Sequence, residues 1–498
     1  MMEWVIANMA PLMFGALVLF LLLGYPVAFA LAANGIVFGL IGIELGLLTP
    51  ALFQALPERI FGIMANDTLL AIPFFTFMGL VLERSGMAED LLDTIGQLFG
   101  PMRGGLAYAV IFVGALLAAT TGVVAASVIS MGLISLPIML RYGYDKRLAA
   151  GVIAASGTLA QIIPPSLVLI IMADQLGKSV GDMYEGAMIP GLVLTSLYVG
   201  YVVLLSIIKP NACPALPLEA RSLRGFKLML RVLTTLVPPL VLIFLVLGTI
   251  FLGIATPTEG GAMGAAGAMI LALARKRITL KLLRQAMETT GKLSSFVVFI
   301  LVGSTVFGLV FRGVNGDLWV EHLLLGLPGG QVGFLIVVNI LVFVLAFFLD
   351  FFELSFIIVP LLAPVADKLG IDLVWFGVLL AVNMQTSFMH PPFGFALFYL
   401  RSVAPASVKT TDIYWGAIPF VCIQIIMVAL IIIFPNIVSY GDEAQKAQAQ
   451  MERDGTAPPA VDLDTLMKQG DADSDAENKQ KEDDTAANLL KNLGGDNK

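Results

Sequence analysis

The sequence has little charge for its length. Asp, Glu, Lys and Arg make up 13% of its 498 residues, whereas about a quarter is usual for a soluble domain. Its mean hydropathy is +0.91, and apolar runs of ~20 residues, long enough to cross a bilayer, recur before residue 437. Lipid must therefore surround most of this chain, which leaves no segment before residue 437 for a soluble catalytic domain.

Motifs that carry chemistry are also missing. The sequence contains no G-x-x-x-x-G-K-[ST] loop, which excludes nucleotide hydrolysis by this chain, and no H-E-x-x-H or G-x-S-x-G. It has two cysteines, Cys213 and Cys422, too few for a disulfide framework and at a spacing that fits no metal motif. We therefore expect a protein that is not an enzyme and needs no cofactor.

The acidic excess is confined to one end of the chain. The net charge is −7, but residues 437–498 hold 14 acidic and seven basic residues, and the rest of the chain holds 22 of each. Nearly all of this end lacks apolar periodicity, so it cannot bury enough surface to order itself. We predict an acidic disordered tail over 437–498, and no surface for nucleic acid.

Two apolar stretches, 105–140 and 330–365, are too long for a single crossing. Small or polar residues lie at the middle of each: Thr120-Thr121-Gly122 in the first, and Asp350 and Glu353 in the second. The neighbouring spans require each stretch to enter and leave on the same side. We predict two re-entrant helical hairpins, whose non-helical tips must be covered by protein or must line a wet cavity.

A repeat with a fixed offset runs through the sequence. Pro137, Gly143, Asp145, Pro164 and Pro165 reappear 227 residues later as Pro364, Gly370, Asp372, Pro391 and Pro392. The sequence predicts an all-α polytopic membrane protein with two related halves. Residues 1–225 would contain the hairpin 105–140 and a broken helix 146–174, and residues 226–436 the hairpin 330–365 and a broken helix 372–402.

Lysine and arginine indicate the orientation of the halves. With residue 1 outside the cytoplasm, the inside loops hold 18 of these residues and the outside loops before the tail hold four. This positive-inside bias places both termini outside and gives the two hairpins opposite orientations. Inverted repeats with broken helices are typical of secondary transporters.

The Pro-Pro pairs are candidate coordination sites. A proline pair removes two backbone donors and clashes with the preceding turn, so carbonyls one turn back lose their partners. In the first half, Ser156-Gly157-Thr158 lie shortly before Pro164. In the second half, Asn383 and Thr386 lie shortly before Pro391. A cation could take the carbonyls. The alternative is a proline kink satisfied by neighbouring helices.

Three other features are candidate binding groups. His390 could protonate, could bind a substrate carboxylate, or could be a neutral histidine held by a backbone carbonyl. Asp350 and Glu353 could be cation ligands, or Asp350 could cap the second arm of its hairpin. The hydroxyls of Thr120 and Thr121 and the backbone amides of Thr120, Thr121 and Gly122 are expected at a helix start, which attracts anions.

Four stretches carry a resemblance to a known family: GYDKRLAAGVIAASGTLAQIIPPS, ATPTEGGAMGAA, FLDFFELSFIIVPLLAPVADKLGID and NMQTSFMHPPFGFALFYLRSVAP. The sequence resembles the large membrane subunit of tripartite ATP-independent periplasmic (TRAP) transporters over residues 1–436. The resemblance implies elevator-type transport driven by sodium. It also implies a small four-span membrane subunit and a soluble periplasmic substrate-binding protein as partners. Sodium sites would then fall on Thr121, Ser156 and Gly157 in one half and on Asp350, Asn383 and Thr386 in the other.

The sequence departs from the family where the first hairpin reads Thr120-Thr121-Gly122 in place of the frequent Ser-Gly-Ser. The segments FFELSF and NMQTSF are similar to those of a family subgroup associated with 2-oxo acids and related carboxylates. We therefore expect sodium-coupled import of a small organic anion, a 2-oxo acid or dicarboxylate, across the bacterial inner membrane. The alternatives are a self-sufficient sodium/anion symporter, an intramembrane enzyme using His390, Asp350 and Glu353, and a passive channel.

Overall fold

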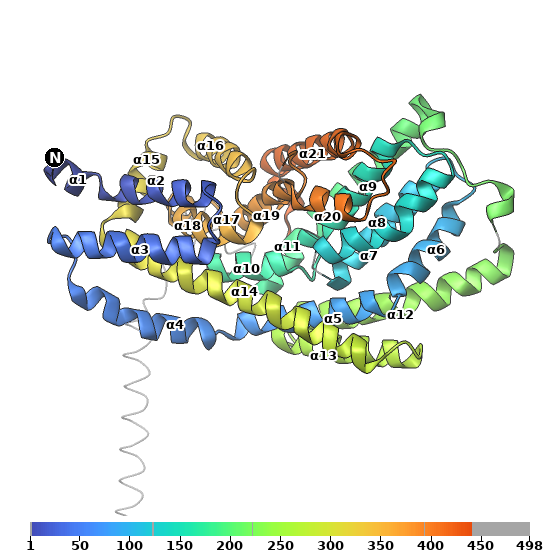
Figure 1. The fold of residues 1–498 in the computed structure, drawn as a ribbon, viewed down its shortest axis with the longest axis horizontal. Coiled ribbons are helices and arrows are strands. Elements are labelled where there is room, and N and C mark those ends of the chain that lie inside the picture. Colours follow the sequence, from blue (N-terminus) through green and yellow to red (C-terminus); the bar gives the residue numbers. More distant parts are fainter. Residues whose placement is uncertain (1, 122–123, 222, 393, 441–498) are drawn as a thin grey trace, which may run out of the picture. The chain divides into compact units, whose positions relative to one another are not determined.

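The computed structural model describes residues 2–121, 124–221, 223–392 and 394–440, and this part of the chain contains helices and no strand. The all-α prediction is confirmed (Figure 1). Gly122 and residues 441–498 lie outside the described residues, and so does nearly all of the predicted tail. Residues up to Tyr440 belong to one compact unit.

The helices of the first half are α1 (Met2–Ala7), α2 (Met9–Leu22), α3 (Val27–Glu44), η1 (Pro50–Ala55), α4 (Leu56–Met64), α5 (Asp67–Arg84), α6 (Met87–Phe99), α7 (Gly105–Thr121), α8 (Val124–Arg141), α9 (Lys146–Thr158), η2 (Leu159–Gln161), α10 (Leu167–Leu176), α11 (Val180–Ile208), η3 (Pro210–Ala212) and η4 (Leu218–Ala220). Those that follow are α12 (Gly225–Phe251), α13 (Pro257–Ala274), α14 (Leu280–Gly313), α15 (Gly316–Leu325), α16 (Gly330–Leu345), α17 (Phe351–Ile357), α18 (Val359–Lys368), α19 (Leu373–Met384), η5 (Gln385–Phe388), α20 (Phe395–Val403), α21 (Thr410–Ile433) and η6 (Pro435–Ile437).

Six helices among the described residues are long and apolar enough to cross a membrane: α3, α8, α11, α12, α14 and α21. The number rises to eight if η1–α4 with α5, bent by 45°, and α15 with α16, bent by 117°, each count as one. The chain is therefore a multi-pass membrane protein. Two helices, α4 and α15, had not been predicted, and residues 280–290 form the beginning of the long helix α14.

The offset of 227 residues found in the sequence recurs in the helix limits. α9 begins at residue 146 and α19 at 373, and α8 spans 124–141 where α17 and α18 together span 351–368. The pairs α7/α16, α10/α20 and α11/α21 follow the same offset to within three residues at each end. A division at residue 225 fits this correspondence and remains a prediction.

The helix contacts repeat as well. α5 packs along α13, and α3 packs along α14 (Figure 1); α13 is the counterpart of α3, and α14 contains the counterpart of α5. Likewise α9 packs on α21 and α11 packs on α19. Because each of these pairs joins a helix of one half to a helix of the other, the two halves interlock.

The α9–α21 contact depends on two glycines. A Cβ placed on Gly151 would lie 2.0 Å from the carbonyl oxygen of Gly416, and one placed on Gly416 would lie 2.1 Å from the carbonyl oxygen of Arg147. Only hydrogen fits at these two positions, so the backbones of the two helices touch. Small residues allow this kind of close approach between membrane helices.

Residues after the last helix still belong to the membrane body. Val438 is buried, and the hydroxyl of Tyr440 donates a short hydrogen bond to Asp372, whose other carboxylate oxygen accepts from the backbone N–H of Trp375 at the start of α19. The body therefore extends to Tyr440, slightly beyond the boundary placed at residue 437 from composition.

We expect Gly151→Ala to lower the stability of the folded chain, because its methyl group would overlap the Gly416 carbonyl. Overpacking a core costs about 1–3 kcal/mol. The measurement is the thermal unfolding midpoint of the purified chain in detergent. Gly200→Ala, in α11 with no atom near its added Cβ, is the control and should be neutral or stabilising. Equal midpoints for the two variants would contradict a tight α9–α21 contact.

Candidate functional site

Both Pro-Pro segments interrupt a helix, as predicted. α9 ends at Thr158 and passes through the 3₁₀ turn η2 to Pro164-Pro165, after which α10 begins at Leu167. α19 passes through η5 to Pro391-Pro392, after which α20 begins at Phe395. Both Pro-Pro peptide bonds are cis. Proline cannot donate to the helix ladder, which weakens a helix at such a pair; α12 nevertheless continues through Pro238-Pro239.

Hydroxyl groups satisfy some of the carbonyls left free by the breaks. The Ser166 hydroxyl donates to the Gln161 carbonyl over 2.6 Å and accepts from the N–H of Val168 at 3.2 Å, which caps α10. Thr158 donates to the carbonyl of Ala155 at 2.8 Å. Part of the first break is thus satisfied within its own segment, whereas the kink interpretation had assigned this role to neighbouring helices.

The first hairpin holds α9 from two sides at Ser156-Gly157. A Cβ on Gly114 of α7 would lie 2.5 Å from the Cβ of Ser156, and one on Gly157 would lie 2.3 Å from a methyl group of Val128 in α8. The Ser156 hydroxyl is fully buried, and no described residue hydrogen-bonds to it. Both arms of the hairpin therefore pack on α9 at the point where α9 carries this unpaired hydroxyl.

The tip of this hairpin is only partly described. The backbone of Thr120 and Thr121 forms the last turn of α7. Gly122, the third residue of the predicted tip, lies outside the described residues. The helix start predicted for Thr120 and Thr121 is therefore wrong, because both lie at the end of α7, where backbone carbonyls and not amides are left over. An ion-binding role for Thr120, Thr121 and Gly122 stays a prediction.

At the second hairpin, Asp350 and Glu353 form a reciprocal cap. The Asp350 carboxylate accepts from the N–H of Glu353 at 2.9 Å, and the Glu353 carboxylate accepts from the N–H of Asp350 at 3.0 Å. This capping box begins α17. The capping interpretation of Asp350 is confirmed, and Glu353 takes part in the same motif. A cation-binding role for either carboxylate remains a prediction.

Asn383 connects the second hairpin to the second broken helix. Its amide nitrogen donates to the backbone carbonyl and to the side-chain oxygen of Asn339 in α16, both at 2.8 Å. Thr386 donates to the carbonyl of Asn383 at 2.7 Å. The sequence had singled out Asn383 and Thr386 but not Asn339, an isolated amide in an apolar run that could have been recognised as an unusual polar residue in a span.

His390 lies between two aromatic rings of the second hairpin. Its ring stacks on Phe347 at 4.2 Å between centroids and meets Phe343 edge-on at 4.3 Å. Its nitrogens meet no hydrogen-bond partner among the described residues, although the carbonyl of Ala346 lies near the ring. In the first half the residue at the position of His390 is Ile163, so this arrangement belongs to one half only.

A third contact joins the two broken helices to each other. The Gln385 amide nitrogen, at the start of η5, donates to the hydroxyl of Thr158, at the end of α9, over 3.1 Å. Both side chains are fully buried. Sequence reasoning had placed Thr158 in the first site but gave no sign that it touches the second.

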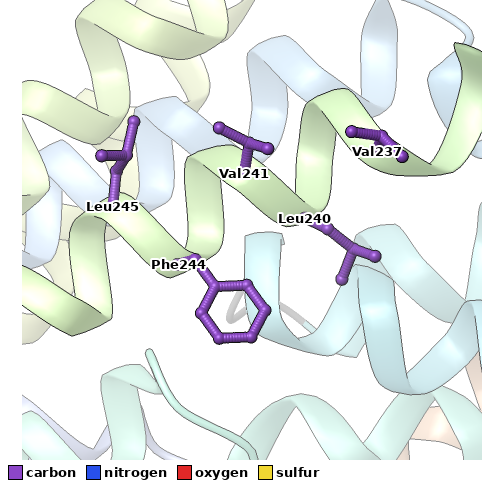
Figure 2. Close-up of a pocket in the computed structure, with 5 residues that line it drawn as sticks. All are labelled: Val237, Leu240, Val241, Phe244 and Leu245. Carbon is purple, nitrogen blue, oxygen red and sulfur yellow. The ribbon is translucent and has the colours of Figure 1, made fainter.

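An apolar groove lies elsewhere, on α12. It is lined by Val237, Leu240, Val241, Phe244 and Leu245 (Figure 2). These side chains offer only apolar contacts, which suit a lipid chain or another helix. None of the predicted site residues lines the groove.

Comparisons with known proteins agree with this architecture. Residues 14–437 match the family described as "Tripartite ATP-independent periplasmic transporter, DctM component". The C4-dicarboxylate TRAP transporter large permease protein DctM of Vibrio cholerae is 30% identical over 83% of this chain and 93% of its own length. The protein of the same name from Pseudomonas aeruginosa is 31% identical over 78% of this chain and 90% of its own length.

A solved structure shares the fold. The YdaH transporter of Alcanivorax borkumensis, described as having an unusual topology, aligns with 78% of this chain and 90% of its own with a TM-score of 0.52 and 15% identity. This likeness concerns the fold alone. The family match over nearly the whole described membrane body and the two relatives lead to one conclusion: the chain belongs to the DctM family and is a large membrane subunit of a TRAP transporter.

Proposed function

We propose that this chain carries a small organic anion across the bacterial inner membrane together with sodium ions. The observation that carries the proposal is the pair of broken helices, equivalent at an offset of 227 residues, each held against a hairpin by buried polar or glycine contacts. Such paired breaks at membrane depth are where secondary transporters bind substrates and coupling ions.

The sodium ions would occupy one site in each half. The first would use Thr121 and Ser156-Gly157, and its support is the buried Ser156 hydroxyl, which no described residue satisfies. The second would use Asp350, Asn383 and Thr386, which contribute a carboxylate, an amide and a hydroxyl. A hydroxyl that donates to a carbonyl, as Thr386 does, still has lone pairs for a cation.

The substrate proposed is a carboxylate, a dicarboxylate or a 2-oxo acid. The relatives from Vibrio cholerae and Pseudomonas aeruginosa are named for C4-dicarboxylates. The segments FFELSF and NMQTSF of the second half resemble those of a subgroup associated with 2-oxo acids. Family membership supports two partners, a small four-span membrane subunit and a soluble periplasmic binding protein. The lysine and arginine distribution supports periplasmic termini.

Transport would follow an elevator mechanism. The hairpins and broken helices would move as one body against a scaffold that includes α3, α5, α13 and α14, which pack on one another in repeated pairs. The hydrogen bonds that cross between these bodies include two of 2.6 Å: Ser130 of α8 donates to Glu83 of α5, and Ser304 of α14 donates to the carbonyl of Phe356 in α17. Both bonds would have to break when the moving body slides.

The first test is the cation dependence of uptake. Proteoliposomes containing the chain and its small subunit, supplied with the binding protein, should accumulate a labelled dicarboxylate only with an inward sodium gradient. Replacing sodium by potassium should reduce the initial rate at least about tenfold. Undiminished uptake in potassium would refute sodium coupling, and uptake without the binding protein would favour a self-sufficient symporter.

A second test separates the two roles of Asp350. Asparagine caps helices as well as aspartate does, so Asp350→Asn should keep the start of α17 while removing the charge. We expect the sodium concentration for half-maximal uptake to rise at least about tenfold, a change of about 1.4 kcal/mol. The thermal unfolding midpoint should stay near that of the unchanged chain.

Asp350→Ala is the matched comparison because it removes both the charge and the cap, so it should also lower stability by about 1 kcal/mol. If Asp350→Asn transports with an unchanged sodium dependence, then Asp350 serves only as a cap and the proposed second site is wrong.

A third test addresses the sliding motion. In a chain whose Cys213 and Cys422 are replaced by serine, cysteines at Glu83 and Ser130 should react together with a short, reducible bifunctional thiol reagent. We expect the link to stop uptake and reduction to restore it. A linked protein that transports at the full rate would show that α5 and α8 do not separate. Each single-cysteine chain treated with the same reagent serves as the control.

A further inference from the structure

The hydrogen bond between Thr158 and Gln385 joins residues that are themselves 227 positions apart. This is the offset that relates the two halves, so the partners occupy equivalent positions. Two equivalent positions can touch only where they lie beside the axis that relates the halves. The bond therefore marks the centre of the membrane body, where the break of the first half meets the break of the second.

Two further buried side chains extend this contact. The amide nitrogen of Gln424 in α21 donates to the hydroxyl of Tyr198 in α11 at 2.9 Å, and Tyr198 also interacts with Thr158. All four side chains are fully buried. Thr158 and Tyr198 come from the first half and Gln385 and Gln424 from the second, so the network links the halves through side chains as well as through packing.

Maintaining this network is costly for the fold. The amide oxygens of Gln385 and Gln424 are buried without a partner among the described residues. Leaving one such group unsatisfied costs about 1–3 kcal/mol, whereas two apolar side chains of similar shape could fill the same space at little cost. A polar link at this place is therefore poorly explained by stability alone.

The positions of the partners indicate what the link connects. Thr158 directly follows Ser156-Gly157, and Gln385 directly precedes Thr386. Both partners lie where an α-helix gives way to a 3₁₀ turn, η2 or η5. Such turns have poorer hydrogen-bond geometry than an α-helix, so a ligand on either segment can reorient it with little opposition.

We propose that the Thr158–Gln385 hydrogen bond couples the two ion-binding segments, so that sodium bound in one half raises the affinity of the other half. Thr158 and Gln385 are positioning residues in this proposal, which rests on the sodium sites proposed above. A cation that draws in Ser156-Gly157 moves the Thr158 hydroxyl, and the bond passes this displacement to Gln385 and the adjacent Thr386. Coupling between two sites is reciprocal, with typical factors of about 5–150.

The experiment measures the thermal unfolding midpoint of the purified full-length chain as sodium replaces potassium at constant ionic strength. For the unchanged chain we expect a cooperative sodium dependence with a Hill coefficient clearly above 1. Thr158→Val removes the hydroxyl at nearly constant volume, and Gln385→Met removes the amide in the same way. Each should reduce the Hill coefficient to about 1 and should weaken the second binding step at least about fivefold.

Two further variants separate coupling from stability. The exchange Thr158→Gln with Gln385→Thr reverses the bond across the axis and should restore cooperativity beyond that of either single variant. Asn34→Leu is the matched control, because Asn34 is a fully buried amide of α3 that donates to the Met13 carbonyl at 3.1 Å within the first half. It should lower the unfolding midpoint but keep the Hill coefficient.

The outcomes distinguish the two proposals. No effect of sodium on the unchanged chain would overturn sodium binding itself. Sodium stabilisation with a Hill coefficient of 1, or a coefficient unchanged in Gln385→Met, would leave the sodium sites in place and overturn the coupling. Gln385→Met decides alone if Thr158→Val does not fold. A loss of cooperativity in Asn34→Leu as well would also overturn the assignment to this bond.

Discussion

The backbone contact between α9 and α21 is the constraint on which the rest of the membrane body depends. Gly151 and Gly416 leave no room for a side chain, so a helix of the first half lies directly against the last helix of the second. Thr158 follows Gly151 by two turns on the same helix. The contact therefore fixes where the first break can lie relative to the second, and the packing of α11 on α19 does the same from the other side.

Within this frame, hydroxyl groups decide how the breaks are stabilised in apolar surroundings. Ser166, Thr158 and Thr386 each donate to a carbonyl near the end of the interrupted helix. These three bonds replace backbone partners that the breaks remove, which lowers the cost of non-helical backbone at membrane depth. The unsatisfied groups that remain include the hydroxyl of Ser156 and the amide oxygen of Gln385, and oxygen atoms of this kind are ligands for a hard cation.

Much of the fold could be predicted because its signals are local. Pro164-Pro165 and Pro391-Pro392 each end a helix, although Pro238-Pro239 lies inside α12 without ending it. Apolar runs of known length give the spans. The capping of α17 was also readable, since Asp350 and Glu353 stand at the spacing of a capping box. By contrast, Gln385 and Thr158 are 227 residues apart, and only the packing of the halves shows that they touch.

Other features were missed for related reasons. Phe343 and Phe347 read as ordinary apolar residues of a span, and nothing in the sequence shows that His390 lies between them. Lys281 and Arg284 give the start of α14 a charged character, yet Thr279 caps a helix that no proline or left-handed glycine interrupts before Gly313. The pattern of charged residues therefore separates the water-exposed part of a helix from its apolar part, but it does not show where the helix begins or ends.

The interlocked packing also has a consequence for how the chain is made. Gly151 and Gly416 are 265 residues apart in the sequence, and at about 5–20 residues per second the ribosome needs on the order of tens of seconds to pass from one to the other. During that time the glycine face of α9 has no partner, and lipid or the insertion machinery must cover it. A nascent chain that stops before α21 would already hold both broken helices but would lack the surface that sets the first one in place. A helix made late in synthesis, α21, therefore completes the packing of the half that was made first.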